Sequence, residues 1–295
     1  MPLPKFEYMA PTTLAEACKL LKDNAPNARV MAGGTDLLIK AKHKAIRPGV
    51  VIGLKNIPDL DVIRVERNKG LTIGATALLA DVAAHPQIKR FYPAIAYAAS
   101  VTANVQIRNM GTVVGNLCNA APSADNAPTL LAMEAEVIIT GVDEQRTVPL
   151  KDFFTGPGLT VLEPGEIVKE IFVPWPPPRS GVSFQHISPR GKVDISAVCV
   201  GAMVIMDGKV CREARVALGA VAPIPMRAKK TERLLKGREL TNELLQQAGA
   251  QATKEAKPIS DMRASARYRR QMVAVLTKRA LEEAVKRART RIKRG

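Results

Sequence analysis

The sequence contains few cysteines, and they are scattered. Cys18, Cys118, Cys199 and Cys211 form neither a CxxC pair nor a cluster. This spacing argues against a zinc site, against an iron–sulfur cluster held by this chain and against a disulfide framework. We therefore expect no metal site here, and we expect the thiols to be free and buried like small apolar groups.

Long apolar runs and aromatic side chains are also scarce. No apolar run reaches the length of a bilayer-spanning helix. The first residues, MPLPKFEYMAP, lack the basic-then-apolar pattern of a signal peptide. We therefore expect a cytoplasmic protein with no transmembrane segment. Aromatic residues make up 4% of the chain, so stacking platforms for single-stranded nucleic acid are scarce as well.

Familiar catalytic motifs are missing too. The sequence has no GxSxG, no HExxH and no paired-carboxylate pattern. Its three histidines, His43, His85 and His186, lie outside the two small-residue motifs described below. We interpret them as structural or surface residues, and we expect no catalytic side chain on this chain.

Positive charge is present in excess, with a formal net charge of +17. Between Lys254 and Gly295, fourteen Lys and Arg residues stand against four Asp and Glu residues. We interpret the stretch 264–293 as an amphipathic helix that docks on its own domain with a solvated basic face. Its apolar face comprises Met272, Val275, Leu276, Ala280, Leu281, Ala284, Val285 and Ala288. Nucleic acid, an anionic membrane surface or an acidic partner protein would also fit this charge.

The hydrophobic pattern predicts two parts joined by a stiff proline-rich linker, PWPPPRSG at 174–181. In the first part, helices are expected at 11–24, 35–44, 78–86, 91–104 and 126–135, and strands at 28–32, 49–54, 136–140, 145–150 and 166–174, with a hairpin over 61–76. In the second part, strands are expected at 182–188, 194–206 and 210–221, with a turn at Asp207-Gly208, followed by helices at 227–236, 241–256 and 264–293.

The first motif is the stretch RVMAGGTDLLIKAK, residues 29–42, in which a strand turns into a helix. Gly33 and Gly34 tolerate positive φ and leave no Cβ in the way of a ligand. Thr35 or Asp36 can cap the following helix, whose free amides would attract a phosphate. The stretch is neither GxGxxG nor a P-loop. Taken alone, it fits a tight turn with nothing bound equally well.

The second motif is QIRNMGTVVGNLCNAAPSAD, residues 106–125, which is also rich in small residues. A run with so little side-chain volume frees the backbone to line a ligand. Polar contacts could come from Thr112, Asn116, Asn119 and Asp125. Taken alone, this run also fits a polar loop between two helices.

Together, the two motifs resemble the FAD-binding (medium) subunit of the molybdenum hydroxylase family, which includes the medium subunit of aerobic carbon monoxide dehydrogenase and the flavin subunit of xanthine dehydrogenases. The similarity extends through 153–174, 217–237 and 257–284. It implies an α+β fold: a two-part FAD-binding domain of the PCMH/vanillyl-alcohol-oxidase-like type, followed by a C-terminal antiparallel sheet with helices. The FAD-binding domain would span 1–175, with lobes at about 1–55 and 56–175, and the C-terminal α+β domain would span 182–295.

The resemblance also implies which residues contact FAD. The first motif would wrap the pyrophosphate with Val30, Met31, Ala32, Gly33, Gly34, Thr35 and Asp36. A second wall, around the phosphates and the ribityl chain, would come from Thr112, Gly115 and Asn116. Asp125 matches an acid that holds the adenosine end of FAD, and Thr102 sits where the family places a residue beside the isoalloxazine ring.

Further contacts are implied outside the two motifs. Val168 matches an apolar FAD contact. Asp194 and Ile195 match a pair whose second member covers the flavin ring from the C-terminal domain. Gln185 aligns with a position near the flavin that is lysine in some relatives, so any charge role of that lysine is absent here.

The second motif departs from the family pattern at one position. Relatives usually read Thr-x-Gly-Gly, whereas this chain reads TVVG, with Val114 at the first glycine. A β-branched residue is poorly suited to positive φ. We therefore expect Val114 at negative φ and Gly115 in the close approach. The cysteine insertion by which 4-hydroxybenzoyl-CoA reductases bind an extra iron–sulfur cluster is also absent from the sequence.

The function implied is that of a FAD-carrying electron-transfer subunit of an oxidoreductase. A large partner would hold the molybdenum–pterin centre and hydroxylate the substrate. Electrons would pass through two [2Fe–2S] clusters on a small subunit to noncovalent FAD here, and then to an external acceptor. The resemblance implies a dimer of heterotrimers. It also argues against nucleic-acid binding, because the long basic helix is an element of the family. A stand-alone FAD-dependent oxidoreductase of related fold remains an alternative.

Overall fold

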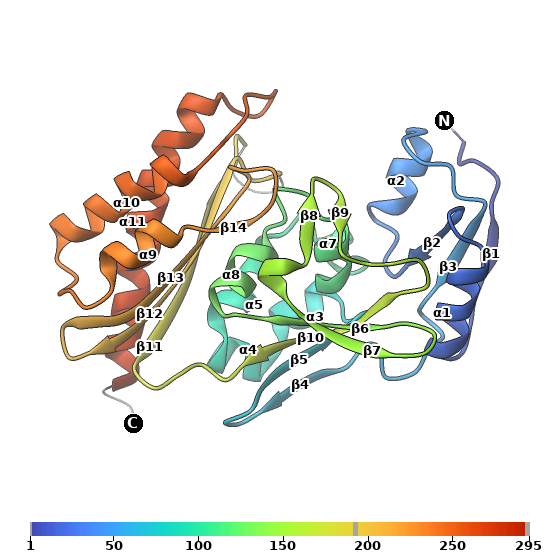
Figure 1. The fold of residues 1–295 in the computed structure, drawn as a ribbon, viewed down its shortest axis with the longest axis horizontal. Helices are drawn as coiled ribbons and strands as arrows, with labels where there is room; N and C mark the ends of the chain where they lie inside the picture. Colours follow the sequence, from blue (N-terminus) through green and yellow to red (C-terminus); the bar gives the residue numbers. More distant parts are fainter. Residues whose placement is uncertain (1, 191–193, 293–295) are drawn as a thin grey trace.

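The computed structural model describes residues 2–190 and 194–292, which form three parts in a row (Figure 1). A three-stranded sheet with two helices lies at one end, a five-stranded sheet with helices occupies the middle, and a four-stranded sheet with three helices lies at the other end. The order of the parts in space follows their order in the sequence.

The first part is a parallel sheet of strand order β1-β3-β2, with β3 in the centre. Its elements are β1 (Glu7–Met9), α1 (Leu14–Asp23), β2 (Ala28–Met31), α2 (Leu37–Lys42) and β3 (Val50–Gly53). The continuously apolar β3 is fully buried, as expected for the centre of a parallel sheet. The side chain of Thr13 caps α1 by accepting a hydrogen bond from the Glu16 amide at 3.2 Å. Strand β1 was not predicted from the sequence, because it is only three residues long and mostly exposed.

The middle part is an antiparallel sheet of strand order β4-β5-β10-β6-β7, with helices on one side of it (Figure 1). The strands are β4 (Ile63–Glu66), β5 (Gly70–Gly74), β6 (Glu136–Thr140), β7 (Gln145–Pro149) and β10 (Ile167–Pro174). The helices are α3 (Leu79–Ala84), α4 (Pro86–Phe91), α5 (Pro93–Val101), α6 (Val105–Arg108), α7 (Val113–Cys118) and α8 (Asn126–Ala132). A short η1 helix (Leu150–Asp152) and the hairpin of β8 (Phe154–Gly156) and β9 (Leu159–Thr160) complete this part.

The C-terminal part is an antiparallel sheet with strands in sequence order. Its elements are β11 (Ser180–Ile187), β12 (Val198–Asp207), β13 (Val210–Gly219), β14 (Met226–Arg227), α9 (Lys229–Leu235), α10 (Asn242–Glu255) and α11 (Ala266–Ile292). The linker is shorter than the predicted 174–181, because Pro174 still pairs with Gly70 in the middle sheet and β11 begins at Ser180.

Two glycines show how the C-terminal sheet is covered on both sides. A Cβ on Gly181 would collide with the Ala284 carbonyl of α11, and a Cβ on Gly201 would collide with the Pro128 carbonyl of α8. The sheet therefore packs against α11 and against a helix of the middle part. The predicted apolar face of the long helix is buried except at Met272, which is partly buried, and at Val275, which is 36% exposed.

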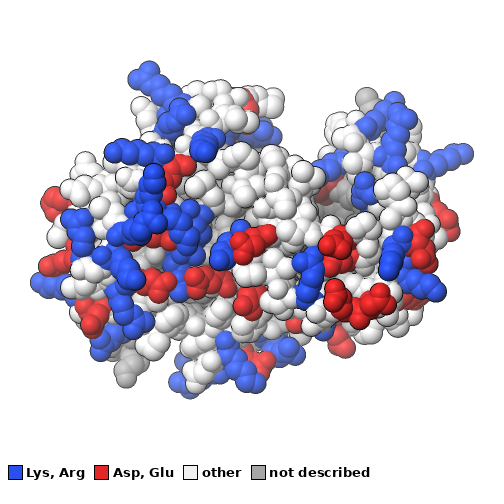
Figure 2. Space-filling view, viewed as in Figure 1, with Lys and Arg blue, Asp and Glu red and all other residues white. Residues whose placement is uncertain are grey.

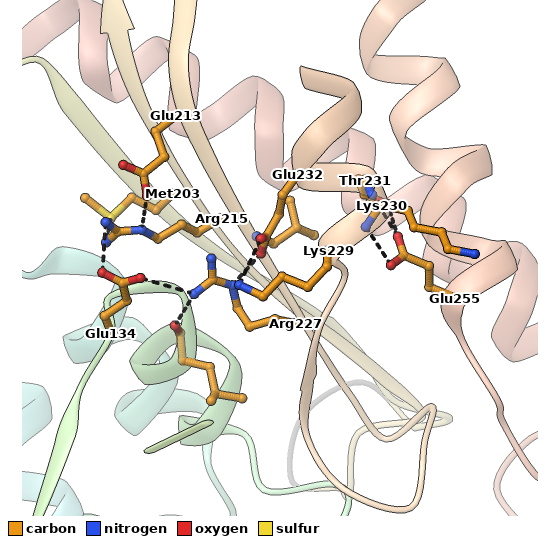
Figure 3. Close-up of polar contacts among 12 residues, drawn as sticks. Glu134, Met203, Glu213, Arg215, Arg227, Lys229, Lys230, Thr231, Glu232 and Glu255 are labelled. Atoms are coloured by element: carbon orange, nitrogen blue, oxygen red, sulfur yellow. Dashed lines mark hydrogen bonds and ion pairs between the residues drawn. The ribbon is translucent and has the colours of Figure 1, made fainter. Parts of the chain in front are cut away.

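A polar network joins the middle part to the C-terminal sheet (Figure 3). Glu134, which follows α8, forms ion pairs with Arg215 of β13 at 2.9 Å and with Arg227 of β14 at 3.7 Å. The Arg227 guanidinium also donates to Glu232 of α9, whose carboxylate accepts the Val216 amide at 3.0 Å. Because both arginine side chains are largely buried, this network contributes to the seating of one part on the other.

Lys and Arg side chains gather over the end of the molecule that α9, α10 and α11 form (Figure 2). One basic residue of α11 is not on the solvated face. The Arg269 side chain is 4% exposed, donates to the carbonyls of Ala197 and Ala220 at 2.8 Å each, and pairs with Asp261 at 2.7 Å. The positive charge of Arg269 therefore holds this helix against neighbouring segments instead of facing solvent.

The structure also shows the state of the cysteines, of possible metal-binding groups and of the longer helices. The four cysteines are free, with Cys18, Cys199 and Cys211 buried and Cys118 half-buried. Within residues 2–190 and 194–292, no group of metal-binding side chains comes together. None of the described helices is both long and apolar enough to cross a membrane.

Candidate functional site

A cavity of about 1170 Å³ lies where the three parts meet. Its walls come from the β2–α2 turn, from the segment between α5 and α8, from Ile167 and Val168 of β10, and from Asp194 and Ile195 of the C-terminal part. The surface has a notch between the first part and the middle part (Figure 2). All the predicted cofactor contacts line this cavity except Gln185.

The two glycines of the first motif serve different purposes. A Cβ on Gly33 would fall on the Met110 carbonyl and within 2.9 Å of the Gly111 Cα, so the turn can lie against the second motif only as glycine. Gly34 has φ +71°, in the left-handed region that favours glycine. The structure thus brings the two motifs into backbone contact at the cavity wall.

The helix that follows this turn is not capped by a side chain. Asp36 occupies the N-cap position of α2 in a helical conformation and makes no capping hydrogen bond, so the predicted capping by Thr35 or Asp36 is absent from the structure. Burial raises the pKa of the Asp36 carboxyl, while nearby Lys40 counteracts the rise. The Leu38 amide donates to the Gly34 carbonyl at 3.0 Å, whereas no side chain caps the backbone amides that precede it.

The second motif places α7 beside the cavity. Thr112 is the N-cap of α7, and its Oγ1 accepts a hydrogen bond from the Gly115 amide at 2.8 Å. Val114 lies inside the helix, is 3% exposed and is absent from the positions with positive φ, as predicted. The valine at the usual glycine position is therefore compatible with this loop, and its side chain forms part of the cavity wall.

A buried asparagine that the sequence reasoning missed organises two of the predicted contacts. Asn126 Nδ2 donates to Thr102 Oγ1 at 3.3 Å and to Asn116 Oδ1 at 3.1 Å, so the two side chains share one donor group. Asn126 is 2% exposed, and its Oδ1 has no partner among the described residues. Only its place directly after Asp125 hinted at this role in the sequence.

The backbone at Ala103 is strained on the cavity wall. Ala103 has φ +49°, which is costly for a residue with a Cβ. The Arg108 guanidinium holds this bend by donating to the Thr102 carbonyl at 3.0 Å and to the Ala103 carbonyl at 2.8 Å. Such strain beside the predicted position of the flavin ring is the kind that clusters at ligand sites.

Asp125 is a buried acid on the wall of the cavity. It is 7% exposed, and burial raises the pKa of its carboxyl to about 6, while a hydrogen bond from Ser196 counteracts the rise. It precedes α8 but makes no capping hydrogen bond to that helix. A carboxylate held in this way can accept hydroxyl or amine donors of a ligand in the cavity.

Replacing Asp125 by Asn should change how the stability of the FAD-free protein depends on pH. Because the folded-state pKa of Asp125 is raised, its contribution to stability is full below pH 4 and is lost as the pH rises through about 6. The free energy of unfolding of Asp125→Asn should therefore equal that of the wild type near pH 4. At pH 8 it should be higher than that of the wild type by up to about 3 kcal/mol. Denaturant titrations at several pH values measure this difference.

The exposed Asp143 supplies the control, because its side chain is 84% exposed. Asp143→Asn should follow the wild type at every pH. A difference between Asp125→Asn and the wild type that stays constant with pH would contradict the prediction.

One cysteine, Cys118, lies on the wall of the cavity. Burial raises the pKa of its thiol to about 12. The thiolate, the form that attacks electrophiles, is therefore scarce at neutral pH. This favours noncovalent binding of a cofactor.

The C-terminal part closes the cavity with residues that the sequence reasoning predicted only in part. Ile195 is 45% exposed, and the predicted Asp194 is paired with Arg190 at 3.0 Å. Met262 and Arg263, from the loop before α11, also line the cavity and were not predicted. Gln185 lies in β11 opposite Val200 and is not on the wall.

The site fits a bulky, phosphate-bearing cofactor. The cavity is large, and one of its walls is a glycine turn without side-chain bulk. A helix without a side-chain cap begins at that turn, and the buried carboxyl of Asp125 lies on another wall. FAD-binding oxidoreductase subunits are a class of protein that these features and the α+β architecture fit, and comparison with known proteins assigns the chain to that class.

The family model described as "FAD binding domain in molybdopterin dehydrogenase" matches residues 4–176. The model described as "CO dehydrogenase flavoprotein C-terminal domain" matches residues 183–284. The chain therefore belongs to the family of FAD-binding subunits of molybdenum hydroxylases, which confirms the predicted family, fold class and cofactor.

The similarity to individual relatives covers nearly the full length of both chains. The chain is 34% identical to a xanthine dehydrogenase FAD-binding subunit of Escherichia coli O157:H7, covering 94% of this chain and 95% of the relative. It is 33% identical to the carbon monoxide dehydrogenase medium chain of Hydrogenophaga pseudoflava, covering 95% and 97%. A solved structure of carbon monoxide dehydrogenase from the latter organism superposes with a TM-score of 0.94 over 97% of this chain and 99% of that chain.

Proposed function

We propose that this chain receives electrons from [2Fe–2S] clusters on a small partner subunit and passes them, through its FAD, to an external acceptor. The chemistry on the organic or gaseous substrate would occur on a large molybdenum–pterin subunit. The single observation that carries the proposal is the backbone contact of Gly33 with Met110 at the cavity, because it joins both FAD motifs into one binding wall. Bound FAD supplies the redox chemistry, and the chain binds and orients it.

The residues of the cavity would divide the work as follows. Gly33, Gly34 and Thr35 would offer backbone amides to the pyrophosphate, helped by the absence of a side-chain cap on α2. Thr112, Gly115 and Asn116 would form the second wall of the phosphate and ribityl region. Asp125 would hold the adenosine end, with Thr102 beside the isoalloxazine ring.

The apolar and C-terminal contacts complete the proposed site. Val168 would pack against the cofactor from the middle sheet, and Ile195 would cover the flavin ring, with Asp194 fixed by its ion pair to Arg190. Gln185 would lie outside the cavity wall. No side chain of this chain is required as a general acid or base.

We also propose the domain division and the assembly. An FAD-binding domain over 1–175 and a C-terminal domain over 182–295 fit the short segment between β10 and β11 and the cluster of buried apolar residues that lies wholly in the C-terminal part. The other cluster extends from the first two parts onto one face of the C-terminal sheet, where the two domains would pack together. The full enzyme would be a dimer of heterotrimers. Cytoplasmic location fits the free thiols, because disulfides are rare in reducing compartments.

The purified full chain should carry FAD. We expect a yellow protein whose visible spectrum shows a flavin, with acid treatment releasing about one FAD per chain because the binding is noncovalent. Co-expression with adjacent candidate subunits should yield a complex that also contains molybdenum and iron. A colourless chain that takes up no added FAD, alone or with partners, would overturn the proposal.

The same preparation separates the two alternatives. A stand-alone flavoprotein oxidoreductase would reduce its FAD with an organic substrate in the absence of any iron–sulfur partner. A nucleic-acid-binding protein would bind DNA with a steep dependence on salt concentration. We expect neither result.

A further inference from the structure

The carboxylate of Asp125 and the hydroxyl of Ser196 meet across the two domains at the cavity. Ser196 Oγ donates to Asp125 Oδ1 at 2.6 Å, although the residues are 71 positions apart in the sequence. Both are buried, Ser196 to 1% exposure and Asp125 to 7%. This is the only hydrogen bond of the Asp125 side chain among the described residues, so Oδ2 is left for a ligand.

Ser196 is held in place by its chain neighbour. The Ala197 amide donates to the Ile187 carbonyl at 2.8 Å, and the Ala197 carbonyl accepts from the buried Arg269 guanidinium at 2.8 Å. The backbone carrying Ser196 is thus tied both to β11 and to α11. A hydroxyl on such a fixed backbone can aim the carboxylate that it contacts.

The groups around Asp125 are neutral at neutral pH. Cys199 of β12 faces Asp125, and burial raises the pKa of its thiol well above the ordinary value. His186 Nδ1 of β11 lies 3.5 Å from Ser196 Oγ, and burial lowers the pKa of its ring, which packs near Tyr97 of α5. Because no described cation pairs with Asp125, the Ser196 hydroxyl is the group that orients the carboxylate and favours its charged form.

We propose that Ser196 is a positioning residue for FAD, through which the C-terminal domain fixes the Asp125 carboxylate toward the adenosine end of the cofactor. The inference rests on the proposed role of Asp125. Ser196 itself need not touch FAD, since it acts through the acid. The FAD-binding domain alone would accordingly present a misoriented carboxylate, so cofactor affinity depends on both domains.

A double-mutant cycle tests this proposal with the full chain, alone or co-purified with its partner subunits. FAD is titrated into the FAD-free protein, and quenching of flavin fluorescence gives Kd. Ser196→Ala should raise Kd about tenfold, because a hydrogen bond to a charged group is lost. In the Asp125→Ala background, the same change should alter Kd less than twofold, because the acceptor is gone.

The pH dependence provides a second readout that a merely structural serine would not move. FAD affinity should fall on acidification as Asp125 becomes protonated, near its pKa of about 6. Because Ser196→Ala removes a hydrogen bond that favours the carboxylate, its midpoint should lie at higher pH than that of the wild type. Neither midpoint should persist in the Asp125→Ala background.

Matched variants keep the test decisive. Ser183 is fully buried in the same sheet, and its hydroxyl has no partner within residues 2–190 and 194–292, so Ser183→Ala should bind FAD like the wild type. If Ser196→Ala does not fold, Ser196→Cys, which retains a weak donor, goes through the same cycle with a smaller expected loss. Equal losses in both backgrounds, or an unchanged Kd, would overturn the role of Ser196. A wild-type chain that binds no FAD would instead overturn the proposed function.

Discussion

Gly33→Ala should yield a protein that binds FAD about 100-fold more weakly than the wild type. The added methyl group would meet the backbone carbonyl of Met110 and the Cα of Gly111, which cannot rotate away as a side chain would. The two motifs must then separate, and overpacking of this kind costs about 1 to 3 kcal/mol. A cost near the upper end of that range, about 2.8 kcal/mol, corresponds to the stated loss when it falls on FAD binding. Flavin content after purification and FAD titration both measure it.

Gly49 provides the control for this prediction. It precedes β3 in the same part of the molecule, is exposed, and an added Cβ would meet only the Asn27 Cβ at an ordinary 3.6 Å. Gly49→Ala should therefore keep the FAD affinity of the wild type. If Gly33→Ala binds FAD within about threefold of the wild type, the close approach of the two motifs is not required for the site.

Glu232→Ala should destabilise the protein by about 3 kcal/mol through the network that joins the middle part to the C-terminal sheet (Figure 3). The Glu232 side chain is 9% exposed and neutralises the Arg227 guanidinium, which is 8% exposed. Its loss leaves Arg227 with a 3.7 Å ion pair to Glu134 and leaves the Val216 amide without its acceptor. Denaturant unfolding of the FAD-free chain at pH 7 gives the value.

Glu213→Ala is the matched comparison. Glu213 also pairs with a buried arginine, Arg215 at 2.6 Å, but its own side chain is 40% exposed, and Glu134 remains as a second partner of that arginine. Water can replace it, so we expect a loss below about 1 kcal/mol. Similar losses for the two variants would show that burial of the ion pair is not what stabilises this network.

Most helices and strands could be predicted from the sequence because their signals are local. The hairpin over 61–76 forms β4 and β5, the turn at Asp207-Gly208 joins β12 to β13, and the long basic segment forms α11. In each case the period of the apolar residues or the chemistry of a turn states the answer within a few residues. The elements that were not predicted, such as β1 and β14, are two or three residues long and depend on their sheet neighbours.

The candidate site was predictable in its motifs but not in its supporting contacts. Glycine at position 34 is explained by positive φ, a property of one residue. The roles of Asn126 and Ser196 are not, because each depends on a partner that the fold brings close. Likewise, nothing in the local sequence distinguishes Gln185, which lies off the cavity wall, from its neighbours in β11.

The sequence by itself determined the class of protein, because the paired motifs and the length of chain between them are properties of the linear order of residues. It also determined that Val114 avoids positive φ, through the sterics of a β-branched side chain. Only the tertiary structure decided that Gly33 lies on Met110 and that Ser196 reaches Asp125. Contacts between distant segments depend on how the three sheets pack, and a one-dimensional pattern does not encode that geometry locally.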